Sequence, residues 1–120
     1  MAQVITDHGY GVVTVKETTT GTSANAYVAV QETDVAAFRT TIHYIKDTDG
    51  ANGITYKIEA TIDGTNYETI KAEATLAAGA DYFETDTDAW DSVKISIKST
   101  VSDSHGTYSV TIKGITGTTG

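Results

Sequence analysis

An unbroken alternation of apolar and polar side chains over residues 54–62, ITYKIEATI, constrains this chain more than any other feature. Neighbouring side chains of a β-strand point to opposite faces, so a period of two residues predicts a strand with one buried and one wet face. The apolar face would hold Ile54, Tyr56, Ile58, Ala60 and Ile62. The other face would hold Thr55, Lys57, Glu59 and Thr61.

A tight turn follows this strand. Asp63-Gly64-Thr65-Asn66 offers Asp-Gly, a pair that adopts positive φ easily. Residues 67–76 then alternate again, with Ile70, Ala72, Ala74 and Leu76 on one face. We therefore expect a β-hairpin over residues 54–76.

The C-terminal third repeats this pattern. Residues 92–100 and 107–113 alternate around the polar turn 102–106, which predicts a second hairpin. Its inward residues would be Val93, Ile95, Ile97, Tyr108, Val110 and Ile112.

The N-terminal half is less regular. We expect strands at 11–16, 25–30 and 38–46, a Thr/Gly/Ser loop at 17–24, and a further short strand at 81–85. Residues 34–38, DVAAF, could instead form one helical turn before the strand at 38–46.

These segments predict an all-β, antiparallel β-sandwich of about eight strands, either jelly-roll or immunoglobulin-like. A length of 120 residues suits a single domain. We place that domain at residues 11–115, with an N-terminal arm at 1–10 and a flexible tail at 116–120, because neither end carries an alternating apolar face. In an assembly, such ends could order on a neighbouring chain.

Composition supports the same fold class. The chain has 23 threonines, and threonine is β-branched, fits a pleated strand and forms helices poorly. Proline is absent, so the turns must rely on Gly, Asn and Asp.

Charge and cysteine content exclude several functions. A net charge of -8 with eight scattered basic residues argues against a nucleic-acid binder, which needs a basic patch. The absence of cysteine excludes disulfides, thiolate metal sites and thiol nucleophiles. The start, MAQVITDHGYG, lacks the basic and apolar regions of a secretory signal, and no apolar run reaches transmembrane length. We expect synthesis and release in a cytoplasm.

No constellation of residues points to catalysis. His8, His43 and His105 are scattered, and they form no zinc-like pattern of ligands. No serine lies in a G-x-S-x-G elbow, and Ser104-His105 adjacency does not make a triad. A small hydrolase would rest only on the 16 acidic residues, of which no pair stands out. We therefore predict a protein that is not an enzyme and has no cofactor.

Two acidic segments have the oxygen-rich character of cation sites. Residues 47–53 place Asp47, Asp49 and Asn52 in a calcium-loop-like run, but position 12 is Ile58 rather than the Glu of an EF-hand. The same run suits a polar turn whose side chains bond the local backbone. A second cluster contains Asp86, Asp88 and Asp91 beside Glu84, and it equally suits a solvated loop.

Three aromatic residues are candidate contacts. Trp90, the only tryptophan, lies in the second acidic segment. Its ring could close one end of the sandwich core, or be exposed and stack on a sugar or a neighbouring subunit. Tyr10 and Tyr82 are the other candidate interaction residues, because alternation does not fix their faces.

The segments YKIEATIDGTNYETI and YFETDTDAWDSVKISIKSTVSDSHGTYSVTIKG, within residues 54–114, resemble small structural proteins of tailed bacteriophages. In that family an Asp-Gly-Thr-Asn-aromatic hairpin precedes a loop with an aromatic residue, a strand like VKISIKS, a glycine turn and a last strand. The motifs also occur in carbohydrate-binding and discoidin-like sandwiches. The resemblance implies a virion component, either a capsid decoration protein or a tail or fibre module, and supplies no catalytic residues.

The expected role is therefore a virion structural protein, with head decoration preferred over tail. Its partner would be the major capsid protein or another virion protein, and the resemblance implies a homo-oligomer, with a trimer on threefold capsid positions. The rival interpretation is a glycan-binding module, which rests on Trp90 and the seven tyrosines. Neither nucleic acid nor membrane is an expected partner.

Overall fold

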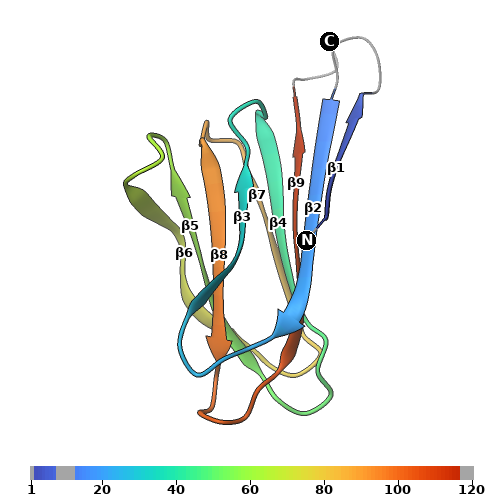
Figure 1. The fold of residues 1–120 in the computed structure, drawn as a ribbon, viewed down its shortest axis with the longest axis vertical. Coiled ribbons are helices and arrows are strands. Elements are labelled where there is room, and N and C mark those ends of the chain that lie inside the picture. Colours follow the sequence, from blue (N-terminus) through green and yellow to red (C-terminus); the bar gives the residue numbers. More distant parts are fainter. Residues whose placement is uncertain (1, 8–12, 117–120) are drawn as a thin grey trace.

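The computed structural model describes residues 2–7 and 13–116. Nine strands form over these residues, in two layers (Figure 1). They are β1 (Ala2–Asp7), β2 (Val13–Thr22), β3 (Val28–Asp34), β4 (Thr40–Asp47), β5 (Ile54–Thr61), β6 (Tyr67–Leu76), β7 (Asp81–Asp86), β8 (Ser92–Ser99) and β9 (Thr107–Ile115). No helix in the described part of the chain is long and apolar enough to cross a membrane.

The strands form two antiparallel sheets. Sheet A has the order β1-β2-β9-β4-β7, and sheet B has the order β3-β8-β5-β6. The orders β2-β9-β4-β7 and β3-β8-β5-β6 are those of an eight-stranded jelly roll. Strand β1 is a ninth strand that pairs with β2 at one edge of sheet A (Figure 1). The predicted antiparallel β-sandwich is therefore confirmed, in its jelly-roll form.

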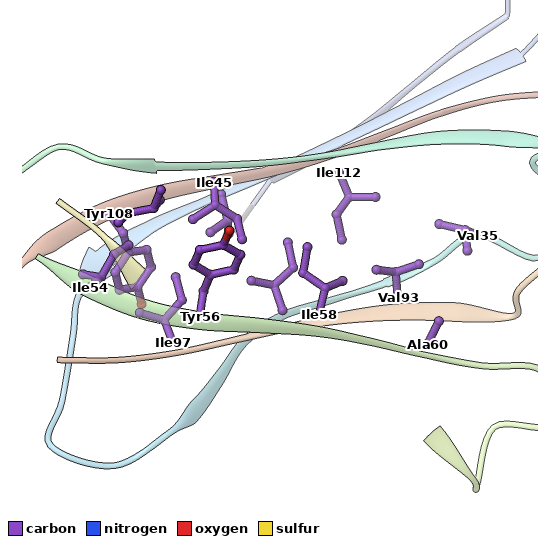
Figure 2. Packing of buried hydrophobic residues seen from close by; sticks show 13 residues of the cluster. Val35, Ile45, Ile54, Tyr56, Ile58, Ala60, Val93, Ile97, Tyr108 and Ile112 are labelled. Carbon is purple, nitrogen blue, oxygen red and sulfur yellow. The ribbon is translucent and has the colours of Figure 1, made fainter. Parts of the chain in front are cut away.

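The core lies between the sheets. Ile45 and Ile112 of sheet A point toward Tyr56, Ile58 and Val93 of sheet B (Figure 2). All five are at most 2% exposed. Because every second side chain of a strand faces the core, β4, β5, β8 and β9 each contribute buried residues to it, and burying them is the main force that holds the two layers together.

The first predicted hairpin is confirmed. Strand β5 pairs with β6 from Ile54↔Leu76 to Thr61↔Tyr67. Its turn uses Gly64 at a φ of 82°, and the Asp63 side chain accepts the backbone N–H groups of Thr65 and Asn66 at 2.8 and 2.7 Å. The expected burial of Ile62 is wrong, since its side chain is 66% exposed. The strand ends at Thr61, whose buried hydroxyl accepts the N–H of Gly64, so Ile62 already belongs to the turn.

The second predicted hairpin is wrong. Strand β8 pairs with β3 and β5 in sheet B, whereas β9 pairs with β2 and β4 in sheet A. The turn between them therefore crosses from one sheet to the other. All six residues predicted to face inward are nevertheless buried. Alternation fixes which face of a strand meets the core, but a strand and its successor can share a core either side by side or across it.

The N-terminal predictions need three corrections. The expected loop at 17–24 is largely strand, because β2 continues to Thr22 and pairs with β9 over nine positions. The strand expected at 25–30 instead spans Val28–Asp34. Residues 34–38 form no helix; they make a turn closed by the Phe38 N–H and the Val35 carbonyl at 2.9 Å.

The segment expected to be an arm contributes strand β1. Residues Ala2–Asp7 pair with Val13–Thr18 of β2 in a regular antiparallel register. Val4 and Ile5 remain 56% and 64% exposed, so the strand is held by its backbone more than by burial of these two side chains.

Candidate functional site

A buried polar chain links strands β4 and β7. His43 is fully buried, and its Nε2 lies 2.9 Å from the Thr41 hydroxyl. Its Nδ1 lies 3.1 Å from Oε2 of Glu84, whose other oxygen accepts the Tyr82 hydroxyl at 2.8 Å. Both ring nitrogens and both carboxylate oxygens thus have partners, so the chain is satisfied from within the domain.

The pKa values of Glu84 and Tyr82 in this hydrogen-bonded series are shifted in opposite directions. Burial raises the pKa of Glu84, but the hydrogen bonds from His43 and Tyr82 outweigh it, so that this pKa lies below its ordinary value. Burial, together with the hydrogen bond to Glu84, raises the pKa of the Tyr82 hydroxyl. Glu84 is held as a carboxylate and Tyr82 as a neutral donor, which suits a structural clamp better than an acid or base for a substrate.

His105 belongs to a second small cluster. Its Nδ1 lies 2.8 Å from the Ser99 hydroxyl, which contacts the Ser23 hydroxyl at 2.7 Å. The Gly106 N–H donates to the same Ser23 oxygen at 2.9 Å. Ser99 and Ser23 are both buried, so this serine–histidine contact ties together loops at one end of the sandwich and does not present a nucleophile.

The carboxylates of the Asp47–Asp49 segment accept local backbone N–H groups, while Oδ2 of Asp47 has no hydrogen-bond partner among the described residues. One oxygen of Asp49 accepts the N–H groups of Ala51 and Asn52 at 2.9 and 2.7 Å, and these hydrogen bonds lower the pKa of Asp49. Asp47 is fully buried and accepts the N–H of Asp49 at 2.8 Å. The segment forms the polar turn that the sequence offered as the alternative to a calcium loop.

The second acidic segment is organised in the same way. Asp86 accepts the backbone N–H of Asp88 at 2.7 Å and the indole Nε1–H of Trp90 at 3.2 Å. The backbone of Asp91 bonds Thr61 and Val35. Over the described residues, no three His, Asp or Glu side chains come together as a group that could hold a metal ion.

Of the three aromatic candidates, Trp90 and Tyr82 both belong to the sandwich. Trp90 is partly buried and packs against the core. Tyr82 is also partly buried, with its ring centroid 5.3 Å from that of Tyr56. Tyr10, like His8, lies outside the described residues.

Sequence reasoning missed a network on the outer face of sheet B. The Tyr27 hydroxyl donates to Glu73 at 2.5 Å, while the ammonium groups of Lys57 and Lys98 lie 4.7 and 4.8 Å from the Tyr27 ring centroid. A similar unit joins Lys94, 3.9 Å from the ring of Tyr67, to the hydrogen bond between Tyr67 and Glu32. Within residues 2–7 and 13–116, four of the eight basic residues, Lys57, Lys71, Lys94 and Lys98, contact tyrosine rings. The ammonium groups of these lysines therefore lie against tyrosine rings and near glutamate carboxylates, and do not form a continuous basic surface.

A shallow apolar groove was also missed. It lies between β1, β2 and the β3–β4 connection, has a volume of about 390 Å³, and is lined mainly by Ile5, Val13, Val15, Ala37 and Phe38. Sheet A has one strand more than sheet B, and the extra strand borders this groove. The adjacent Val4 and Ile5 could have indicated this groove from the sequence, because an exposed edge strand with apolar residues on both faces is unusual.

Comparisons with known proteins identify the fold alone. No protein-family model matches the chain, and no curated protein matches it. Three similar structures illustrate the likeness. A Bacillus endospore appendage protein, from a family of disulfide-linked pili, has 18% identity and a TM-score of 0.57, with 88% of this chain and 89% of that chain covered. The SPBc2 prophage-derived protein YomS has 16% identity and a TM-score of 0.53, with 84% and 95% covered.

The third is the protein of infectious bursal virus-derived T=1 particles, with 14% identity and a TM-score of 0.52. The match covers 88% of this chain but 31% of the viral one, so this chain corresponds to about a third of that protein. All three identities are low, so what the chain shares with these proteins is its β-sandwich fold.

Proposed function

We propose that this chain is a non-enzymatic structural protein of a bacteriophage-like particle, and that it decorates the capsid lattice. The observation that carries the proposal is that polar side chains bond one another inside the domain while large apolar side chains are exposed on its surface. The side chains of His43, Glu84 and Tyr82, which could have formed a reactive site, have their hydrogen-bond partners within the domain. The surface instead exposes several large apolar side chains, namely Val4, Ile5, Val28, Ile42, Ile62, Phe83 and Val101.

Such a surface suits a protein that works by burying area against partners. A specific interface of standard size buries about 1,600 Å² in total, and many identical copies on a lattice add avidity. The likeness to a prophage-derived protein, to a pilus protein and to the protein of a virus-derived particle supports a role in large assemblies. This chain has no cysteine, so it would have to assemble without the disulfide links of that pilus family.

The partner would be the major capsid protein or another protein of the particle, and the protein would be found on the virion. The bacteriophage resemblance further predicts a trimer on threefold capsid positions, and this stays a prediction.

The test is reconstitution on capsids that lack this chain. Purified protein, added in increasing amounts, should bind until a fixed number of copies per capsid is reached, and should raise the temperature at which the capsid breaks open. An unrelated acidic β-sandwich of similar size is the control. A bound amount that rises without a plateau, or an opening temperature that does not change, would contradict capsid decoration.

A further inference from the structure

The four edge strands of the two sheets differ in how well they resist pairing with another chain. Strand β3 has an extra residue near Val30, between the pairs Ala29↔Ser96 and Gln31↔Ile95. Strand β6 has irregular register opposite Ile58 of β5. Such bulges twist an edge strand and disturb the row of backbone groups that a further strand would need. Both edges of sheet B are therefore blunted.

The edges of sheet A differ in charge. Strand β7 contains Asp81, Glu84 and Asp86, whereas the only charged residue of β1 is Asp7. Strand β1 pairs with β2 in an unbroken register, and its other edge faces no strand among the described residues. Its backbone edge is thus the regular, weakly charged one, and it lies at the margin of the molecule (Figure 1).

Both faces of β1 carry exposed apolar side chains. Val4 is opposite Lys16 on the outer face of sheet A, and Ile5 is opposite the buried Val15 on the inner face. Ile5 also forms one wall of the apolar groove. An added strand would cover Val4 and Ile5, and would continue the hydrogen-bonded ladder of sheet A.

The direction of the strands selects the partner. Sheet A has five strands, each antiparallel to its neighbours, so β1 and β7 run in the same direction. A second copy that keeps the same face of its sheet outward can pair antiparallel only like edge to like edge, across a two-fold axis perpendicular to the sheet. Pairing β7 with β7 would bring two sets of carboxylates together, which is repulsive. Pairing β1 with β1 avoids this.

We propose that β1 is the site at which a second copy of this chain pairs, antiparallel and across a two-fold axis, so that two sheets A become one ten-stranded sheet. Directly opposite residues of an antiparallel pair lie on the same face, so the central pair is Val4 with Val4 or Ile5 with Ile5. In either register the two copies of Ile5 are directly opposite or diagonal neighbours, about 5–8 Å apart. The contact is isologous and closes after two copies.

This proposal does not depend on the particle to which the protein belongs, and it is tested on the isolated chain. A strand edge covers less than a standard interface, so we expect a weak, concentration-dependent dimer. In sedimentation equilibrium the apparent mass should rise from the monomer's 12.7 kDa toward twice that value. A chain that stays monomeric at millimolar concentration, or that forms a trimer without a dimer, would overturn the proposal.

Introducing a charge of either sign at Ile5 tests whether β1 forms the contact. In each of the variants Ile5→Asp and Ile5→Lys, two like charges would lie beside the two-fold axis. The dissociation constant of the dimer should therefore rise at least about tenfold, so that each variant is monomeric where the original chain dimerises. An equal mixture of the two should dimerise again. Ile62→Asp is the matched control, since Ile62 is 66% exposed and Ile5 is 64% exposed, and it should dimerise as the original chain does. Dimerisation of Ile5→Asp equal to that of Ile62→Asp, or a mixture that stays monomeric, would place the contact elsewhere.

Discussion

At the scale of single residues, the polar side chains inside the sandwich depend on partners that are distant in sequence. On β4 the inward positions are Thr41, His43, Ile45 and Asp47, while Ile42 is 40% exposed. Hydropathy alone would predict that the opposite face of this strand, which carries Ile42 and Tyr44, meets the core. The reason for the observed orientation lies in partners distant in sequence, such as Glu84, which bond His43 only once the strands are paired. A single sequence carries no local sign of such a partner.

Glu84 should stabilise the fold in its charged form. Replacing it by glutamine, Glu84→Gln, removes a charged acceptor from His43 and Tyr82 and should lower the free energy of unfolding at pH 7 by about 1–3 kcal/mol. Because the pKa of Glu84 is lowered by folding, its contribution is present above the unfolded value of about 4.3 and is lost as the pH falls through the folded value. Urea unfolding at pH 7 and pH 3 should therefore show the difference shrinking at the lower pH.

The exposed Glu68 on β6 provides the control for this experiment. Glu68→Gln should change the free energy of unfolding by no more than about 0.5 kcal/mol at either pH. A Glu84→Gln deficit that is the same at pH 3 as at pH 7 would show that the loss comes from packing and not from the carboxylate.

Trp90 should contribute to stability through packing. Its ring contacts the core and its indole N–H bonds Asp86, so Trp90→Ala should lower the free energy of unfolding by about 2–3 kcal/mol, below the range for a fully buried tryptophan. Trp90→Phe keeps most of the packing and should cost less than about 1.5 kcal/mol. Chemical denaturation measures both, and a glycan array run with the same proteins tests the rival function. Unchanged stability of Trp90→Ala together with loss of a glycan signal would favour the glycan-binding module.

At the scale of strands and turns, local chemistry was a good guide wherever the partner strand follows directly. The hairpin of β5 and β6 could be predicted because its Asp-Gly turn and its two alternating strands are contiguous. The pairing of β2 with β9 could not, because Val15 and Gly114 are brought together only by the jelly-roll topology. The threonines of residues 18–22 resembled a loop, yet they pair well in a central strand since threonine suits a pleated surface.

The turn at Gly64 tests the local part of this account. Gly64 has a φ of 82°, and, apart from the glycine itself and its two chain neighbours, no heavy atom of the described residues lies within 4 Å of the place that an alanine Cβ would take. Gly64→Ala should therefore lose about 1–2 kcal/mol from backbone strain alone. Gly50 has equally open surroundings but no positive φ, and Gly50→Ala should be neutral or slightly stabilising. The midpoints of urea unfolding compare the two directly. Equal effects of the two substitutions would mean that the left-handed conformation is not what the turn requires.

Strand β1 should be dispensable for folding and needed for attachment. Deleting residues 1–8 removes an edge strand whose Val4 and Ile5 are largely exposed, so the rest of the sandwich should still unfold cooperatively, with a modest loss of thermal stability. Occupancy on the particle should fall. Thermal unfolding and particle binding of this truncation measure the two effects separately. A collapse of the unfolding temperature would assign β1 to the core, and unchanged occupancy would show that it makes no contact in the assembly.

At the scale of the whole molecule, the fold class could be predicted but the arrangement of the strands could not. Alternation and threonine content determine that the chain is built of half-buried strands, and the result is a set of buried hydrophobic side chains enclosed between two sheets. Strand order depends on contacts far apart along the chain, for which a single sequence gives no local signal. The same holds for the groove beside β1, because its lining residues, such as Ile5 and Phe38, are far apart along the chain.

The central claim is that this acidic jelly roll acts by occupying a place in a particle, and the composition of that particle tests it most directly. Intact particles from the source that encodes this chain should be purified through a density gradient, treated with protease-free high-salt washes, and quantified by mass spectrometry. The account predicts that the chain remains with the particles in a fixed, many-fold ratio to the major capsid protein. Its absence from intact particles, or its presence only in trace amounts that the washes remove, would contradict the account.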